Sequence, residues 1–243
     1  MAINNILPFL STFVMLIFTV SVFQRYFTRR RPAYLFWGIG LALFGLGSFA
    51  EAYLSLAWSA LVFYLWYLGG AVLNAAWLGH GTVKLLFRHR RWTDVVTVIL
   101  VLGSVGAVVL MFSTPLDASQ YQPGVPISEQ YRAIMPPGAP VRMTTPFFNI
   151  YGLLTLAGGA IYSAYLFWRK RVLPNRVIGN VLIAVGALSI GFASSLTRLG
   201  FAQYLYLGEL IAAVLMYAGF RAAAAPNAER VPEPEAARQG AGR

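Results

Sequence analysis

The chain has 243 residues, of which 58% are hydrophobic and only 11% are charged. Because soluble domains carry roughly 25% charged residues, this composition excludes an ordinary soluble globular protein. The sequence contains no cysteine, which excludes disulfides, thiolate catalysis, iron–sulfur clusters and cysteine-ligated zinc. A formal net charge of +11 would suggest nucleic-acid binding in a soluble protein, but the positions of the charges indicate a different role.

Seven apolar stretches follow one another along the chain, and each is long enough to cross a bilayer, which takes roughly 20 residues. The first, at about 5–24, has hardly any charge before it and several arginines after it. A secretory signal has the reverse order, so we expect this stretch to be retained as a helix. The other six lie at about 33–54, 60–86, 93–113, 146–168, 176–197 and 202–220. The sequence therefore predicts an all-α integral membrane protein with seven transmembrane helices in residues 1–221.

Two longer segments fall outside the apolar stretches. Residues 114–145 form the one sizeable connection, and their many prolines argue against a long helix there. This outer connection is either a lid over the mouth of the bundle or a simple connector. Residues 222–243 are rich in alanine, proline and charge, which predicts a disordered cytoplasmic tail.

The basic residues predict how the helices are oriented. Sixteen of the nineteen lysines and arginines follow helices one, three, five and seven, and so lie on one side of the membrane. Positive charge concentrates in cytoplasmic loops, so we expect the N-terminus outside and the C-terminus in the cytoplasm. The net charge is then a topology signal and not a sign of nucleic-acid binding. The expected location is a bacterial inner (plasma) membrane, where the partners would be the lipid bilayer and a protein bound through the basic inner loops.

The two ends of the chain match each other in order and spacing. The basic run at 29–31 matches the run at 169–171, and the residues at 67–70 match those at 206–209. One helix lies between the two triplets of helices, so the triplets would share one orientation. The pattern predicts a 3+1+3 parallel repeat about an axis near the membrane normal.

Ionisable residues at membrane depth are costly and are therefore candidates for function. Glu209 lies deepest, on the order of 12 Å into the seventh helix at about 1.5 Å per residue. Glu51 and Arg198 lie near the outer ends of helices two and six, and Arg198 is in reach of Glu209 across a short turn. Serine and glycine stand opposite the two acids in the repeat, which predicts an asymmetric polar site between the halves. A structural ion pair that fixes helix packing is the alternative.

Helix three adds a polar and aromatic face. Tyr67, Asn74 and Trp77 share one side of a regular helix. Asn74 either lines a ligand pocket or bonds a neighbouring helix through its amide. Several tyrosines and Trp66 gather at the outer ends of helices three and seven, where we interpret most of them as membrane-interface residues. The candidate ligand-binding residues are Glu51, Tyr67, Asn74, Arg198, Tyr206 and Glu209.

The remaining residues argue against several chemistries. His80 and His89 lie toward the basic side, far from the acids, so they predict neither a metal site nor a haem ligand. The sequence has no nucleophile elbow, P-loop, zinc-protease or paired-carboxylate motif. We therefore expect no catalytic residue, no metal and no cofactor. The inner half of the bundle is almost wholly apolar, which argues against a polar path across the membrane.

Two families share parts of this pattern. Microbial rhodopsins have seven helices in the same orientation, but their retinal is attached to a lysine in helix seven, where this chain has none. The chain more closely resembles the seven-helix sensor region of bacterial histidine kinases over about 33–220. The similarity lies in the basic loop after helix one, in Phe36-Trp37-Gly38 and in Glu51. The resemblance implies a sensor, and because no kinase domain follows, we expect it to signal through a partner.

Together these patterns predict a non-enzymatic membrane sensor or ligand-binding module with an outward-facing polar pocket. One alternative is a small-solute or proton-coupled transporter, in which Glu209 would bind and release the proton. Another alternative is an accessory subunit of a larger membrane complex, with no site of its own.

Overall fold

The computed structural model describes residues 3–88, 90–170, 173–199, 201 and 204–225, without the side chains of residues 3–5 and of Arg198. Over these ranges the chain is helical and has no strand. The tail that we predict to be disordered lies outside the described residues from position 226 onward.

Seven helical spans are long and apolar enough to cross a membrane, which confirms the predicted number. The third span is one continuous run of three segments, namely α3 (Ala60–Trp66), the π-helix η1 (Tyr67–Leu73) and α4 (Asn74–Leu86). The other spans are α1 (Ile3–Arg29), α2 (Pro32–Leu54), α5 (Trp92–Phe112), α7 (Pro140–Arg169), α8 (Pro174–Arg198) and α9 (Leu205–Ala224). The direction of these helices across a membrane and the internal repeat stay predictions.

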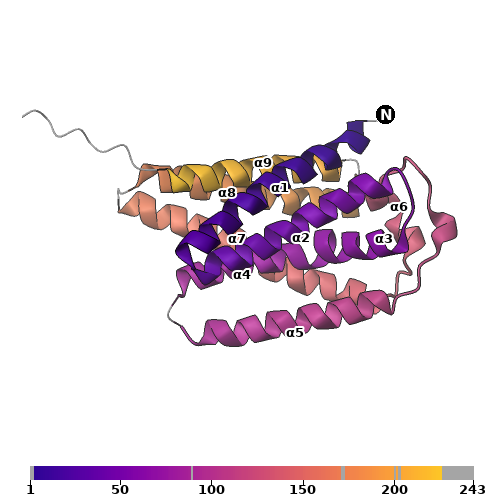
Figure 1. Ribbon diagram of the computed structural model, residues 1–243, viewed down its shortest axis with the longest axis horizontal. Helices are drawn as coiled ribbons and strands as arrows, with labels where there is room; N and C mark the ends of the chain where they lie inside the picture. Colours follow the sequence, from indigo (N-terminus) through magenta and orange to yellow (C-terminus); the bar gives the residue numbers. More distant parts are fainter. Residues whose placement is uncertain (1–2, 89, 171–172, 200, 202–203, 226–243) are drawn as a thin grey trace, which may run out of the picture.

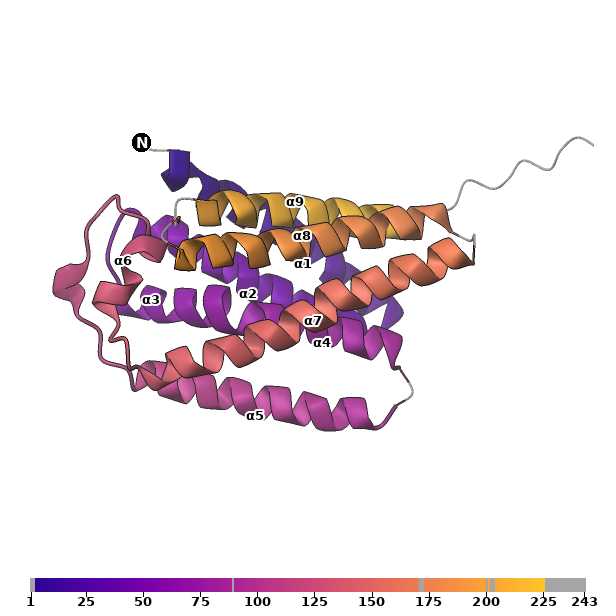
Figure 2. The same ribbon diagram turned by 180° about the vertical axis from the view of Figure 1, so that it is seen from behind.

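Six spans form a closed ring, and α5 lies outside it. Helices α1, α2, α4, α7, α8 and α9 each pack against the next, and α9 packs back against α1. Helix α5 packs against α4, η1 and α7 and lies apart from the other spans in both views (Figure 1, Figure 2). Only 22% of the most apolar window of α5 is buried, against 56% for the third span. The third span is therefore central and α5 is peripheral.

Glycines let α2 and η1 pack backbone against backbone. A Cβ atom at Gly47 would lie 2.5 Å from Cα of Gly70, and one at Gly69 would lie 2.8 Å from the carbonyl oxygen of Leu43. Only glycine fits such a close helix contact without a shift of the helices. On the side of the third span, the contact lies in the π-helix at 67–73. The apolar pattern of the sequence predicts a regular helix over 60–86 and gives no sign of this π-helix.

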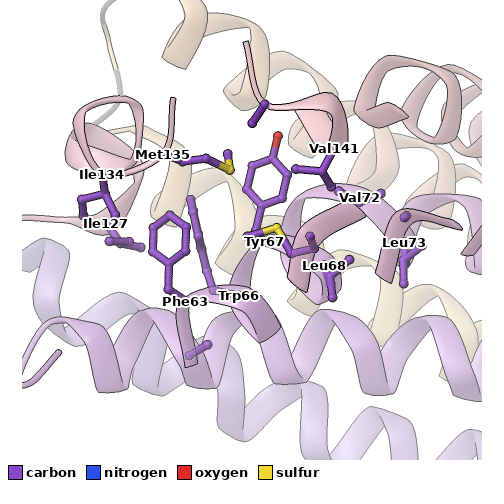
Figure 3. Packing of buried hydrophobic residues seen from close by; sticks show 14 of the residues in the cluster. Phe63, Trp66, Tyr67, Leu68, Val72, Leu73, Ile127, Ile134, Met135 and Val141 are labelled. Atoms are coloured by element: carbon purple, nitrogen blue, oxygen red, sulfur yellow. The ribbon is translucent and has the colours of Figure 1, made fainter. Parts of the chain in front are cut away.

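Residues 114–139, which we call the cover, fold over one end of the ring. They contain η2 (Ala118–Gln120) and α6 (Ile127–Ile134), and α7 begins directly after them. Ile127, Ile134 and Met135 are fully buried, and Figure 3 shows them gathered around Phe63 and Trp66 of α3. The connection is therefore packed against the ring, and its role as a lid or as a simple connector stays a prediction.

Hydrogen bonds hold the cover to the ring and give it internal structure. The Tyr121 hydroxyl donates to the carbonyl oxygen of Leu54 at 2.8 Å, so the cover is tied to the end of α2. Within the cover, Gln130 Nε2 donates to the carbonyl oxygen of Val125 at 2.8 Å. At its surface, the Ser119 hydroxyl and backbone N–H donate to Asp117 and hold the pKa of that carboxyl below its usual range.

The basic segments gather at the opposite end of the bundle from α6. The turn between α1 and α2, the connection between α4 and α5, the start of α8 and the end of α9 all lie at this end (Figure 1, Figure 2). We call it the basic end, and the end under the cover the covered end. The two ends are therefore chemically different, as the distribution of charge in the sequence predicts.

The glycine contact gives a test of the packing between α2 and η1. Replacing Gly47 by alanine would push a methyl group into the backbone of Gly70, so we expect a loss of about 1–3 kcal/mol of stability. The matched control is Gly106→Ala on the open face of α5, where an added Cβ meets nothing within 4 Å. Thermal unfolding of the purified protein in detergent measures both variants. Equal midpoints for the two would show that the contact does not limit the packing.

Candidate functional site

Glu51 and Glu209 meet at the covered end. Glu51 lies in the last turn of α2 and is only 4% exposed, and Glu209 lies near the start of α9 and is partly buried. Their carboxyl groups lie close enough to interact with each other. Two ionised carboxylates repel, so this approach is favourable only while at least one of the two groups carries a proton.

Aromatic side chains hold this carboxyl pair in place. Nε1 of Trp66 donates to Oε1 of Glu51 at 2.9 Å. Tyr206, one turn before Glu209 on α9, is 3% exposed, and its phenol lies close enough to both carboxyl groups to interact with them electrostatically. The backbone N–H of Ser128 donates to the Tyr206 hydroxyl at 3.5 Å. Because Ser128 belongs to α6, the cover itself takes part in the site.

Four buried oxygen atoms at this end have unused hydrogen-bonding capacity. None of them has a hydrogen-bond partner among the described residues, and they are Oε2 of Glu51 and the hydroxyls of Ser11, Ser48 and Ser128. Buried polar atoms are normally paired, so a cluster of unpaired acceptors is suited to a small ligand with N–H or O–H donors.

The packing of α1 against α2 places two of these serines at one level. A Cβ atom at Gly45 would lie 3.3 Å from Cβ of Met15, which fixes how the two antiparallel helices are aligned. Ser11 is one turn before Met15, and Ser48 is about one turn after Gly45. Ser48 in turn lies one turn before Glu51 on α2. Ser11 and Ser48 therefore lie at about the same level of the ring, within about one helical turn of Glu51 along α2.

The other predicted site residues divide into two groups. Tyr67 is 4% exposed, contacts the ring of Trp66, and exchanges a hydrogen bond with Thr145 at 3.1 Å, so it lies beside the site. Asn74 lies apart: its amide oxygen accepts from the N–H of Ala75, and no hydrogen bond joins it to Glu51, Tyr206 or Glu209 in the described part of the chain. The side chain of Arg198 lies outside what the structure describes, so its predicted ion pair with Glu209 stays a prediction.

Trp66 differs from its interpretation as a membrane-interface residue. It is 5% exposed because α6 covers it, and the ring of Tyr131 from α6 packs on it at 5.7 Å between centroids. The sequence does contain a sign of this position. The connection between α2 and α3 is short, and a helical hairpin with so short a turn brings Trp66 back toward Glu51. The roles of Ser128 and Tyr131 carried no comparable signal in the sequence.

A second polar cluster lies nearer the basic end and corrects the expectation of an apolar inner half. His80 is fully buried, with Nδ1 at 2.8 Å from the Tyr151 hydroxyl of α7 and Nε2 at 2.8 Å from the Thr97 hydroxyl of α5. Nearby, Nε1 of Trp37 donates to the Thr82 hydroxyl at 3.3 Å. The pattern was missed because each polar residue stands alone among apolar neighbours, and only packing brings them together.

His80 is one of several polar side chains of α4 that contact α5. Trp77 Nε1 donates to the Ser104 hydroxyl at 3.1 Å, and Lys84 pairs with Asp94 at 2.6 Å. Trp77, His80 and Lys84 are spaced three and four residues apart, so they lie along one face of α4. These polar contacts act together with the apolar packing of Ala107 and Met111, which holds α5 nearer the covered end.

The described residues contain no cluster of three or more histidine, aspartate and glutamate side chains that could hold a metal ion. His89 lies outside the described residues. Comparisons with protein-family models, with curated proteins and with solved structures found no match to this chain.

The His80 contacts predict how α5 is anchored. In His80→Leu the Tyr151 hydroxyl loses its contact to His80, and Thr97 keeps only its bond to the carbonyl oxygen of Thr93, so we expect a loss of about 1–3 kcal/mol of stability and faster amide hydrogen exchange in α5. Tyr151→Phe is the control, since it removes only the contact to α7 and should leave exchange in α5 nearly unchanged. Hydrogen-exchange mass spectrometry of the two variants makes the measurement. Unchanged protection of α5 in His80→Leu would refute this role.

Proposed function

We propose that the chain is a non-enzymatic membrane sensor whose switch is the Glu51–Glu209 carboxyl pair. The covered end would face outward and the basic end the cytoplasm, in the inner membrane of a bacterium. The observation that carries the proposal is that two acids from opposite ends of the chain share a site that the cover closes. The resemblance to histidine-kinase sensor regions supports the same function.

The switch has two states that differ in charge. While the pair shares a proton, its hydrogen bond ties α2 to α9. When both groups ionise, their repulsion at contact distance favours separation of the two helices. A small ligand with N–H or O–H donors would act on the same pair, because it would satisfy the unpaired oxygen of Glu51 and the neighbouring serines. Either signal shifts the balance between the two arrangements.

Contacts along α9 can carry this change to the basic end. Phe220, near the inner end of α9, packs on Phe18 of α1 with ring centroids 5.4 Å apart. The guanidinium of Arg25 lies over the Phe220 ring at 4.8 Å. A shift of α9 would therefore move charged groups at the basic end, where a protein partner would bind. Such a movement would couple the covered end to the basic end.

The carboxyl pair predicts a pH response that depends on Glu209. In the wild type, raising the pH should remove the infrared band of the shared carboxylic acid and change the Trp66 fluorescence, taken as the difference between wild type and Trp66→Phe. Glu209→Gln should move the midpoint of the fluorescence response to lower pH, since the amide at position 209 can donate to the ionised form of Glu51 and the repulsion between two carboxylates is lost. The control is Glu129→Gln, which changes an exposed acid on α6. A midpoint in Glu209→Gln equal to that in Glu129→Gln would contradict the proposal.

The His80 cluster favours a proton-coupled transporter as the second candidate. It supplies a titratable side chain in the inner half of the ring, between the carboxyl pair and the Lys84–Asp94 pair. A transporter should move protons into liposomes that contain a trapped pH-sensitive dye, and both Glu209→Gln and His80→Phe should abolish that flux. Absence of flux in the wild type, together with the pH response above, favours the sensor.

An accessory subunit of a larger complex would use the peripheral helix. The outward side of α5 exposes large apolar residues that a neighbouring membrane protein would bury, among them Val95, Val98, Ile99 and Leu102. In that case Glu51 and Glu209 would be dispensable, and a fixed partner would co-purify in mild detergent.

A further inference from the structure

The basic end contains a cavity of about 410 Å³ that the proposed sensor function does not use. It lies where the start of α2, the end of α4 and the start of α5 come together. Five cations and one acid line it, and they are Arg31, Lys84, Arg88, Arg90, Arg91 and Asp94.

The charges around this cavity are unbalanced. Lys84 donates to Asp94 at 2.6 Å, so these two side chains neutralise each other. The four arginines form no ion pair within the described residues, and all four are exposed. The cavity therefore has an excess of positive charge, carried by side chains that are free to contact a ligand.

Two helix N-termini add to this positive potential. Helix α2 begins at Pro32 and α5 at Trp92, both beside the cavity. The residues that precede them, Arg31 and Arg91, make no side-chain capping hydrogen bond. The N-terminus of a helix carries a partial positive charge and attracts anions, phosphate groups above all.

We propose that this cavity binds a phosphate group. Arginine guanidinium groups match phosphate in bidentate geometry, and four of them around one cavity are suited to a group with several acceptor oxygens. An anionic phospholipid headgroup and a soluble phosphate compound share this chemistry. Leu85 lines the cavity, and Trp92, which begins α5 beside it, is an exposed apolar side chain, which suits a lipid whose chains lie along α5.

The test uses the full chain and two sources of phosphate. Native mass spectrometry after incubation with equal amounts of phosphatidylglycerol and phosphatidylcholine measures lipid preference. Thermal unfolding in detergent with and without pyrophosphate measures binding of a soluble phosphate. The pocket variant is Arg88→Gln with Arg91→Gln. The matched control is Arg169→Gln with Lys170→Gln, which removes the same charge from exposed positions at the same end, outside the cavity.

We expect the wild type to retain phosphatidylglycerol, and the pocket variant to retain about thirtyfold less, since it removes two arginines of the cavity that contribute roughly 1 kcal/mol each. The control should retain nearly as much as the wild type. If pyrophosphate stabilises the wild type but not the pocket variant, and no lipid preference is seen, the site binds a soluble phosphate. The proposal is overturned if the control loses as much as the pocket variant, or if neither probe depends on the cavity. Both double variants replace exposed side chains, so we expect both to fold. Their thermal unfolding midpoints in the absence of ligand check this.

Discussion

The close approach of two carboxyl groups is the interaction on which the proposed site at the covered end depends. Glu51 and Glu209 come from helices that are far apart in the chain, and the fold brings their side chains together. The pair has uncharged groups beside it in the described part of the chain, namely the indole N–H of Trp66 and the phenol of Tyr206, and a backbone N–H of α6 donates in turn to that phenol. Such a site is sensitive, because the charge of the pair changes by one unit with a single proton while its surroundings stay the same.

The rest of the ring distributes its polar contacts in two layers. Apolar residues of α1, α2, α7 and α9 fill the core of the ring, with the carboxyl pair at one end and the His80 cluster nearer the other. Hydrogen bonds between helices contribute on average only about 0.6 kcal/mol each within a membrane. These two layers of polar contacts therefore determine mainly which helices are neighbours and add little stability. The glycine contact sets how closely α2 and η1 pack.

The sequence predicts the helices well and the site only in part. The length of the apolar stretches was enough to predict seven spans, because every helix that crosses a bilayer needs about that many apolar residues. The two acids also stood out, since charge is rare in such stretches. Asn74 was grouped with them on the assumption of a regular helix, and the π-helix at 67–73 changes the angle between Tyr67 and Asn74. Ser128 could not be found, because its importance arises only when α6 folds back over the ring.

The cover also has a kinetic consequence. Any molecule that reaches Glu51 from the covered end must first separate Ile127, Ile134 and Met135 from Phe63 and Trp66, which are packed together in one cluster. Loop and lid openings of this kind occur on microsecond to millisecond timescales or slower. The rate at which α6 lifts, and not diffusion in the surrounding solution, then sets the shortest interval over which the buried acids can follow a change outside.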